Sequence, residues 1–158
     1  MGRINDAIYN VLTGFVNVFI TLTKKATLPK YAHGTGDACC DLCAEEDIIV
    51  PAGKVKLVKT GIKVAIPRGF VLLVCSRSGM ALKDSVFVIN APGIVDPDYR
   101  GDVGVLLCNI GDKDYHVTAG ARIAQALLVQ SEHMHFNVVS ELSETDRGEG
   151  GFGSTGVK

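Results

Sequence analysis

Apolar and polar residues alternate along most of this chain in the way that is typical of short β-strands. The runs of strand-forming residues are separated by turn-forming stretches such as Pro51–Gly53 and Pro67–Gly69. Strands are predicted at residues 16–23, 48–50, 54–59, 62–66, 70–75, 86–89, 103–109, 114–117, 123–130 and 134–138. Many short strands at this spacing indicate an all-β sandwich or barrel and not alternating strands and helices.

Near the N-terminus the apolar spacing becomes helical instead. Apolar residues recur there on one helical face, at Ile4, Ala7, Ile8, Val11, Leu12 and Phe15. We therefore predict a short amphipathic helix as an N-terminal extension over residues 1–15, and one or two further helical turns at 78–84. The β domain is expected over residues 16–140. Residues 141–158 are polar and then glycine-rich, which predicts a flexible tail.

Length and composition restrict the classes of protein to which this chain can belong. The 158 residues suit one domain, and a hydrophobic content of 47% with a mean hydropathy of +0.24 predicts apolar surface that is buried between subunits. The net charge of −1 gives no basic surface for nucleic acid. The longest apolar candidate, residues 11–23, is too short and too interrupted to span a membrane. We expect a cytoplasmic protein that binds neither nucleic acid nor membrane.

Five cysteines stand at positions 39, 40, 43, 75 and 108. A zinc site from Cys40, Cys43, His133 and His135 is one interpretation, but this spacing matches no standard zinc pattern. A reduced cytosolic protein with unpaired thiols is the favoured interpretation.

The stretch from Asn90 to Asp102, NAPGIVDPDYRGD, combines the most varied chemistry in the chain. It lies between the apolar runs 86–89 and 103–107, which predicts a hairpin with a wide loop. The loop carries an amide, several carboxylates, a phenol and a guanidinium, more than a turn requires. Loops held by rigid strands are common places for binding and catalytic sites.

Other polar stretches are suited to phosphate. Ser76–Gly79 follows a very apolar strand and offers a guanidinium fork, hydroxyls and a bare backbone amide. Arg122 and Gln125 flank an otherwise apolar strand, where a buried amide needs partners. In the tail, Phe152 has no apolar neighbour to pack on, so it is suited to stacking on a flat ring such as a base. The alternatives are that Ser76–Gly79 is only a capped turn and that the tail is only a flexible linker.

Together these stretches resemble the five ordered motifs of the trimeric deoxyuridine triphosphatases (dUTPases). The matching segments are GDACCDLCA, SRSGMA, NAPGIVDPDYRGD, GARIAQ and RGEGGFGSTG, in family order over residues 27 to 156. The sequence departs from the family at Cys39–Cys40, where Gly and an aromatic residue are usual, at Pro97, and at Asp102, where Glu is common. The resemblance implies a jelly-roll-like β-barrel that forms a homotrimer. Each of its three active sites would take the third motif from one chain, the first, second and fourth from another, and the tail from the third.

The reaction that the resemblance implies is hydrolysis of dUTP to dUMP and pyrophosphate, which limits uracil in DNA and supplies dUMP for dTMP synthesis. Asp96 would orient and deprotonate a water for in-line attack on the α-phosphate. Mg²⁺ would be held by the substrate phosphates, with Asp41 reaching it only through water. Gln125 would join Asp41 and Asp96 in the catalytic set.

The substrate-binding residues implied by the resemblance fall into three groups. The α- and β-phosphates would contact Arg77, Ser78, Gly79 and Gln125. The γ-phosphate would contact Arg147, Ser154 and Thr155. The base and sugar would contact Asn90, Gly93, Ile94, Val95, Tyr99, Phe152 and Gly153, with Phe152 stacked on the base and Tyr99 placed to exclude a 2′-hydroxyl.

Two alternatives stay open from the sequence. A dCTP deaminase shares the fold, although the Tyr99 and Arg77–Gly79 motifs favour the triphosphatase. A nucleotide-sensing trimer without catalysis is the alternative from another class. The N-terminal helix would be the natural place for a protein partner.

Overall fold

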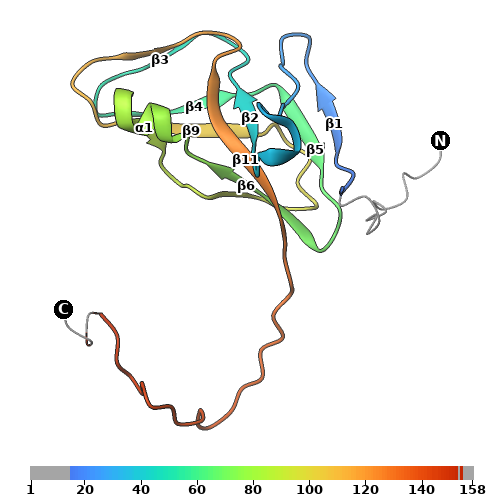
Figure 1. Ribbon diagram of the computed structural model, residues 1–158, viewed down its shortest axis with the longest axis vertical. Helices are drawn as coiled ribbons and strands as arrows, with labels where there is room; N and C mark the ends of the chain where they lie inside the picture. The colour runs from blue at the N-terminus through green and yellow to red at the C-terminus, as the bar shows by residue number, and fades with distance from the viewer. Residues whose placement is uncertain (1–14, 153, 155–158) are drawn as a thin grey trace.

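Short antiparallel β-strands form nearly all of the regular structure in the computed structural model, which describes residues 15–152 and 154 (Figure 1). The described elements are β1 (Phe19–Leu22), a 3₁₀ turn (Gly34–Gly36), β2 (Cys40–Cys43), β3 (Ile48–Val50), β4 (Val55–Lys59), β5 (Ile62–Ala65), β6 (Phe70–Cys75), α1 (Ser78–Asp84), β7 (Val86–Val88), β8 (Gly93–Val95), β9 (Gly104–Asn109), β10 (Tyr115–Val117) and β11 (Arg122–Gln130). The predicted all-β class is confirmed. The helices in this part of the chain are too short to cross a membrane.

Two larger sheets enclose the core. One has the strand order β2-β11-β6-β8 and the other has the order β4-β9-β7, while β1 pairs with β5 and β10 pairs with β3. Each strand turns alternate side chains inward. The buried cluster joins Leu42 and Val74 from the first sheet with Val58, Val105 and Leu107 from the second. This is the jelly-roll-like arrangement that the resemblance implies.

The structure adds two strands that the sequence pattern did not reveal. β2 lies in a stretch for which no strand was predicted, and β8 lies inside the predicted loop of residues 90–102. β7 pairs with β9 as the predicted hairpin requires, but β8 crosses to the other sheet and pairs with β6. The loop is therefore anchored to both sheets, which fixes its position between them.

The strand predicted at residues 134–138 is wrong for the single chain. Beyond Gln130 the chain leaves the barrel and runs away from it into the C-terminal segment (Figure 1). Met134, Phe136 and Val138 keep the predicted alternation but are 78%, 78% and 100% exposed. A strand needs a neighbouring backbone to pair with, and no strand of the described residues pairs with 134–138.

The predicted N-terminal helix, apart from Phe15, lies outside the described residues. The prediction that a protein partner binds it therefore stays a prediction.

The buried side chain of Asn109 supports a testable statement about stability. Its Nδ2 donates to the carbonyl oxygens of Val50, at 2.9 Å, and Lys113, at 2.8 Å, and its Oδ1 accepts from the Gly111 N–H, at 2.9 Å. We predict that Asn109→Ala lowers the free energy of unfolding by about 2–4 kcal/mol, because a cavity replaces the buried carboxamide and the backbone groups of Val50, Gly111 and Lys113 lose their partners. Urea unfolding at fixed protein concentration measures the change. The exposed Asn17→Ala is the matched control, and equal effects of both changes would contradict the prediction.

Candidate active site

Three of the predicted motifs meet on one face of the sheet that contains β2, β11 and β6. Gln125 of β11 stands opposite Asp41 of β2 on one side and opposite Cys75 of β6 on the other. Side chains that stand directly opposite each other point to the same face of a sheet. The Asp41 and Gln125 side chains therefore lie together, beside the end of β6 where Ser76 and Arg77 follow.

A cleft of about 360 Å³, here called the polar cleft, opens at this place. Five of the predicted site residues line it: Asp41, Arg77, Ser78, Gly79 and Gln125. It is also lined by Ala32, His33, Asp37, Ala38, Cys39 and Arg122, none of which is among the catalytic and substrate-binding residues that the resemblance implies.

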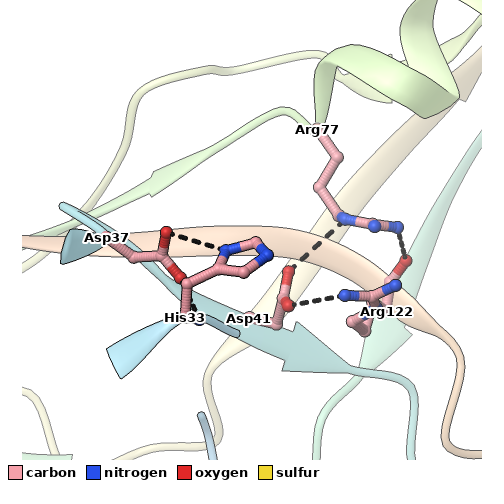
Figure 2. A network of polar contacts seen from close by, with 5 residues as sticks. All are labelled: His33, Asp37, Asp41, Arg77 and Arg122. Atoms are coloured by element: carbon pink, nitrogen blue, oxygen red, sulfur yellow. Dashed lines mark hydrogen bonds and ion pairs between the residues drawn. The ribbon is translucent and has the colours of Figure 1, made fainter. Parts of the chain in front are cut away.

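Asp41 lies between two arginines (Figure 2). Its Oδ1 lies 3.4 Å from Arg77 Nε and its Oδ2 lies 3.1 Å from Arg122 Nη1, while Arg77 Nη1 donates to the Arg122 carbonyl oxygen at 2.7 Å. A guanidinium has five N–H donors, so these contacts fix the Arg77 plane and leave three N–H groups for a ligand. One carboxylate between two guanidinium groups also leaves one positive charge in excess, which favours an anionic ligand.

Gln125 and α1 complete the wall of the cleft. The Gln125 Nε2 donates to the Ser76 carbonyl oxygen at 2.9 Å, which ties β11 to the chain just before Arg77. Ser78 and Gly79 are exposed, and a Cβ at Gly79 would meet no atom within 4 Å. The protein itself leaves the space beside this backbone open to a ligand.

His33 and Asp37 form a pair on the rim of the polar cleft (Figure 2). The His33 backbone N–H donates to Asp37 Oδ2 at 2.6 Å, and His33 Nδ1 lies 3.1 Å from Asp37 Oδ1. These hydrogen bonds hold the pKa of the Asp37 carboxyl below its usual range. Both residues lie in an irregular turn, where no periodic pattern marks a site.

A second, smaller cleft holds the third motif. It is about 170 Å³ and is lined by Ile94, Val95, Asp96, Tyr99, Asp102, Val103 and Gly104. We call it the Asp96 cleft. The Tyr99 hydroxyl donates to the Asp102 carbonyl oxygen at 2.9 Å, and the ring folds over Gly101, where a Cβ would lie 2.3 Å from that hydroxyl.

Asn90 belongs to the same loop. A Cβ at Gly93 would lie 3.1 Å from the Asn90 Nδ2, so the small residue lets this side chain lie close to β8. The structure thus brings Ile94, Val95 and Tyr99 together with Asp96 in one cleft, while Asn90 lies beside Gly93 at the other end of β8.

The two clefts lie apart within one chain. β8 runs antiparallel to β6, with Val95 opposite Leu72, so Asp96 falls level with Val71. Arg77 lies six residues further along, which amounts to roughly 20 Å at about 3.3 Å per residue. A single chain therefore does not bring Asp96 to the polar cleft.

The tail is also separate from both clefts. It runs away from the barrel (Figure 1), and the Phe152 side chain is fully exposed. Arg147 Nε donates to the Gly150 carbonyl oxygen at 2.8 Å within the tail itself, and Ser154 is exposed. Gly153 and Thr155 lie outside the described residues.

The donor set for metals is sparse. Within the described ranges, no group of three or more His, Cys, Asp or Glu side chains is placed to hold a metal ion. Cys40 and Cys43 are three residues apart on β2 and so point to opposite faces. The described chain therefore does not form the zinc site considered from the sequence.

Comparisons with known proteins agree on one family. The sequence profile of the dUTPase family matches residues 24–156. The chain is 45% identical to the deoxyuridine 5′-triphosphate nucleotidohydrolase of Crocosphaera subtropica, and 47% identical to that of a Picosynechococcus species. Each alignment spans 138 residues, 87% of this chain and 96% of the relative. A structure of the Staphylococcus bacteriophage 80alpha dUTPase with dUPNHPP has a TM-score of 0.83 and 28% identity, covering 89% of this chain and 99% of that one.

Cys39, in the wall of the polar cleft, supports a prediction about pH. Burial raises the pKa of its thiol, and Cys75 and Asp37 raise it further. A raised pKa lowers the fraction of the thiol that is ionised at a given pH. Because the thiolate is the reactive form, the thiol then reacts more slowly. We predict that Cys39 reacts more slowly with a thiol reagent in the native protein than in the unfolded chain at pH 8, and that the native rate rises steadily towards alkaline pH. Peptide mapping by mass spectrometry measures both rates, and equal rates in the two states would contradict the prediction.

Proposed function

The chain belongs to the dUTPase family and hydrolyses dUTP to dUMP and pyrophosphate, and we propose that the polar cleft of one subunit and the Asp96 cleft of another together form its active site. The observation that carries this proposal is the division of the chemistry between the two clefts. Phosphate donors line one cleft, while the carboxylate suited to activate water lies with the base-recognition loop in the other.

The polar cleft is proposed to bind the α- and β-phosphates. Arg77 offers its remaining N–H groups, Ser78 its hydroxyl and Gly79 its backbone N–H, and the two guanidinium groups on either side of the Asp41 carboxylate favour a polyanion at this place. Gln125 holds the end of β6 in place through Ser76, so it is proposed to keep these donors aligned with the phosphates. Family membership favours this phosphate chemistry over deamination of dCTP.

Mg²⁺ is part of the proposal, and the residues present fit it. Mg²⁺ usually keeps several waters and is bound through one or two carboxylates together with substrate phosphates. Asp41 is the carboxylate beside the proposed phosphate donors, and its two arginine contacts suit it to hold a metal-bound water and not the ion itself. Bound there, the ion would neutralise charge on the phosphates. A dUTPase of phage phi11, similar in fold to this chain, is described with a structural Mg(II) ion.

Asp96 is proposed as the base that orients the attacking water and accepts its proton. It follows β8 directly, and the turn bond from the Tyr99 N–H to the Asp96 carbonyl oxygen, at 3.1 Å, fixes the backbone beside it. A carboxylate held by a rigid loop suits a reaction in which water must approach the α-phosphate in line.

The base and sugar are proposed to bind along β8. β8 is the edge strand of its sheet, so one side of the Gly93–Val95 backbone has no strand partner among the described residues. Its free N–H and C=O groups can match the edge of uracil, with Asn90 beside them. Tyr99 lies over Gly101 in the position proposed to exclude a 2′-hydroxyl.

The tail is proposed to close over the γ-phosphate of a site on another subunit. Arg147, Ser154 and Thr155 would supply donors, and Phe152, followed by Gly153, would stack on the base. The full exposure of the Phe152 ring supports a role that needs a partner from outside the chain.

The homotrimer is the remaining part of the proposal, and exposed apolar surface supports it. The outward face of the β4-β9-β7 sheet carries Leu57, which is 56% exposed. Ile89, just beyond the end of β7, is 49% exposed. A sheet that is apolar on both faces requires cover on both. Residues 134–138 add a second exposed apolar stretch. All five cysteines are free, which supports the proposed cytoplasmic location.

The role of Asp96 leads to a prediction about turnover. We predict that Asp96→Asn lowers kcat for dUTP by about a hundredfold or more and changes the affinity for a non-hydrolysable dUTP analogue by less than about tenfold. The amide keeps the shape of the carboxylate but cannot accept the proton of water. Pyrophosphate release and calorimetry measure the two effects. A variant that keeps a tenth or more of the wild-type kcat would remove Asp96 from the role of base.

The shared site leads to a prediction about mixed trimers. Asp96→Asn and Arg77→Gln should each give an inactive homotrimer. If one site takes Asp96 and Arg77 from different chains, each mixed trimer formed by co-expression of the two variants with different tags should regain about one third of its sites, because only one of the three neighbouring pairs of chains joins an intact Asp96 to an intact Arg77. Heterotrimers purified through both tags are assayed for pyrophosphate release. Heterotrimers as inactive as the homotrimers would show that the two clefts do not cooperate between chains.

A further inference from the structure

Arg122 contacts two residues of the proposed site; it was noted beside Gln125 in the sequence, but no role was predicted for it. Its side chain lies 3.1 Å from Asp41 Oδ2, and its backbone carbonyl oxygen accepts from Arg77 Nη1 at 2.7 Å. The three side chains are drawn together in Figure 2. Arg122 thus holds the carboxylate through its side chain and the second arginine through its backbone.

The position of Arg122 depends on a β-bulge. Along most of β11 the pairing with β2 keeps one register, in which Gln125 opposes Asp41 and Ala124 opposes Leu42. In that register Cys43 would oppose Ile123, but it opposes Arg122 instead, so β11 contains one extra residue.

Burial along β11 shows what the bulge achieves. Ile123 and Ala124 are 1% and 0% exposed, so two consecutive side chains enter the core. Strict alternation from Gln125 would place Ile123 in the polar cleft and Arg122 in the core. The bulge reverses this placement and turns the guanidinium to the cleft face beside Asp41.

We propose that Arg122 is a positioning residue that holds the Asp41 carboxylate in the orientation needed for substrate binding, so that Asp41 stays in place when Arg77 donates to phosphate. The proposal rests on the proposed function of the polar cleft. In the chain alone, both arginines contact Asp41. A bound phosphate competes for Arg77, which leaves Arg122 as the side chain that keeps Asp41 from turning towards Arg77 or solvent.

The half-exposed side chain of Arg122 makes the proposal testable without loss of the fold. Its side chain is 53% exposed, and substitutions leave in place the hydrogen bond from Arg77 to the backbone carbonyl oxygen of residue 122.

The variants are Arg122→Gln, Arg122→Lys, Asp41→Ala, and Asp41→Ala combined with Arg122→Gln. Binding of the dUTP analogue dUpNHpp with MgCl₂ is measured by calorimetry, and kcat and KM are measured for dUTP. Arg68→Gln, in the exposed turn between β5 and β6, is the control for loss of one positive charge.

We expect Arg122→Gln to weaken analogue binding and to lower kcat/KM by about tenfold or more, with Arg122→Lys intermediate and Arg68→Gln unchanged. In the Asp41→Ala background, adding Arg122→Gln should change binding by less than about twofold, because the group that Arg122 holds is already absent. The unfolding midpoint of Arg122→Gln should match that of the control.

Two results would overturn the proposal. An equal loss in the wild-type and Asp41→Ala backgrounds would show that Arg122 contacts the substrate itself. No loss in Arg122→Gln would show that the ion pair is only a surface contact. Neither result is confused with failure of the proposed function, which would appear as a wild-type protein that does not bind the analogue or release pyrophosphate from dUTP.

Discussion

The register of β11 against its two neighbours is the constraint on which the polar cleft depends. Because β11 lies between β2 and β6, its side chains align those of both strands, so Asp41, Gln125 and the end of β6 reach one face. A one-residue slip would turn this whole set into the core. The bulge at Ile123 shifts the register by one residue at that place only. It changes the face to which Arg122 points and leaves the pairing of Gln125 unchanged. The buried Ile123 and Ala124 fix the bulge, so core packing determines where a surface charge lies.

The sequence predicted the class of fold and most strands, because alternation and turn residues act locally. The resemblance to the dUTPase motifs named Arg77, Ser78, Gly79 and Gln125, which lie with Asp41 in the polar cleft, and Ile94, Val95 and Tyr99, which lie with Asp96. The sequence did not predict β2, whose Cys-Asp-Leu-Cys stretch has no strand-forming composition, or β8, whose three residues gain their strand character only from β6. The prediction at 134–138 failed for the opposite reason, since the alternation is present but no partner strand is. Arg122 was noted in the sequence, but its contact with Asp41 was not predicted, because a bulge breaks the alternation that sequence reasoning relies on.

These failures share one physical cause. A segment becomes a strand only when another strand pairs with it. The local sequence shows whether a segment is suited to be a strand, but not whether a partner strand is present. The same limit applies to the site. Local patterns identify donors, carboxylates and an aromatic residue suited to stacking, but the distance between the two clefts follows from the antiparallel pairing of β8 with β6, which no local pattern contains.

The separation of the two clefts has a chemical consequence in the proposed trimer. Asp41 shows what happens to a carboxylate that shares a cleft with arginines in one chain, since both of its oxygens lie near a guanidinium. A carboxylate held in this way suits positioning, but a base must keep an oxygen free to accept a proton. Asp96, roughly 20 Å along the sheet from Arg77, cannot form such a pair within its own chain. If a neighbouring subunit brings the two clefts together, the triphosphate lies between Asp96 and the arginines, because it occupies their remaining donors. In the proposed trimer, the division of the site between chains would therefore keep the proposed base, Asp96, from pairing with the arginines proposed to bind the phosphates.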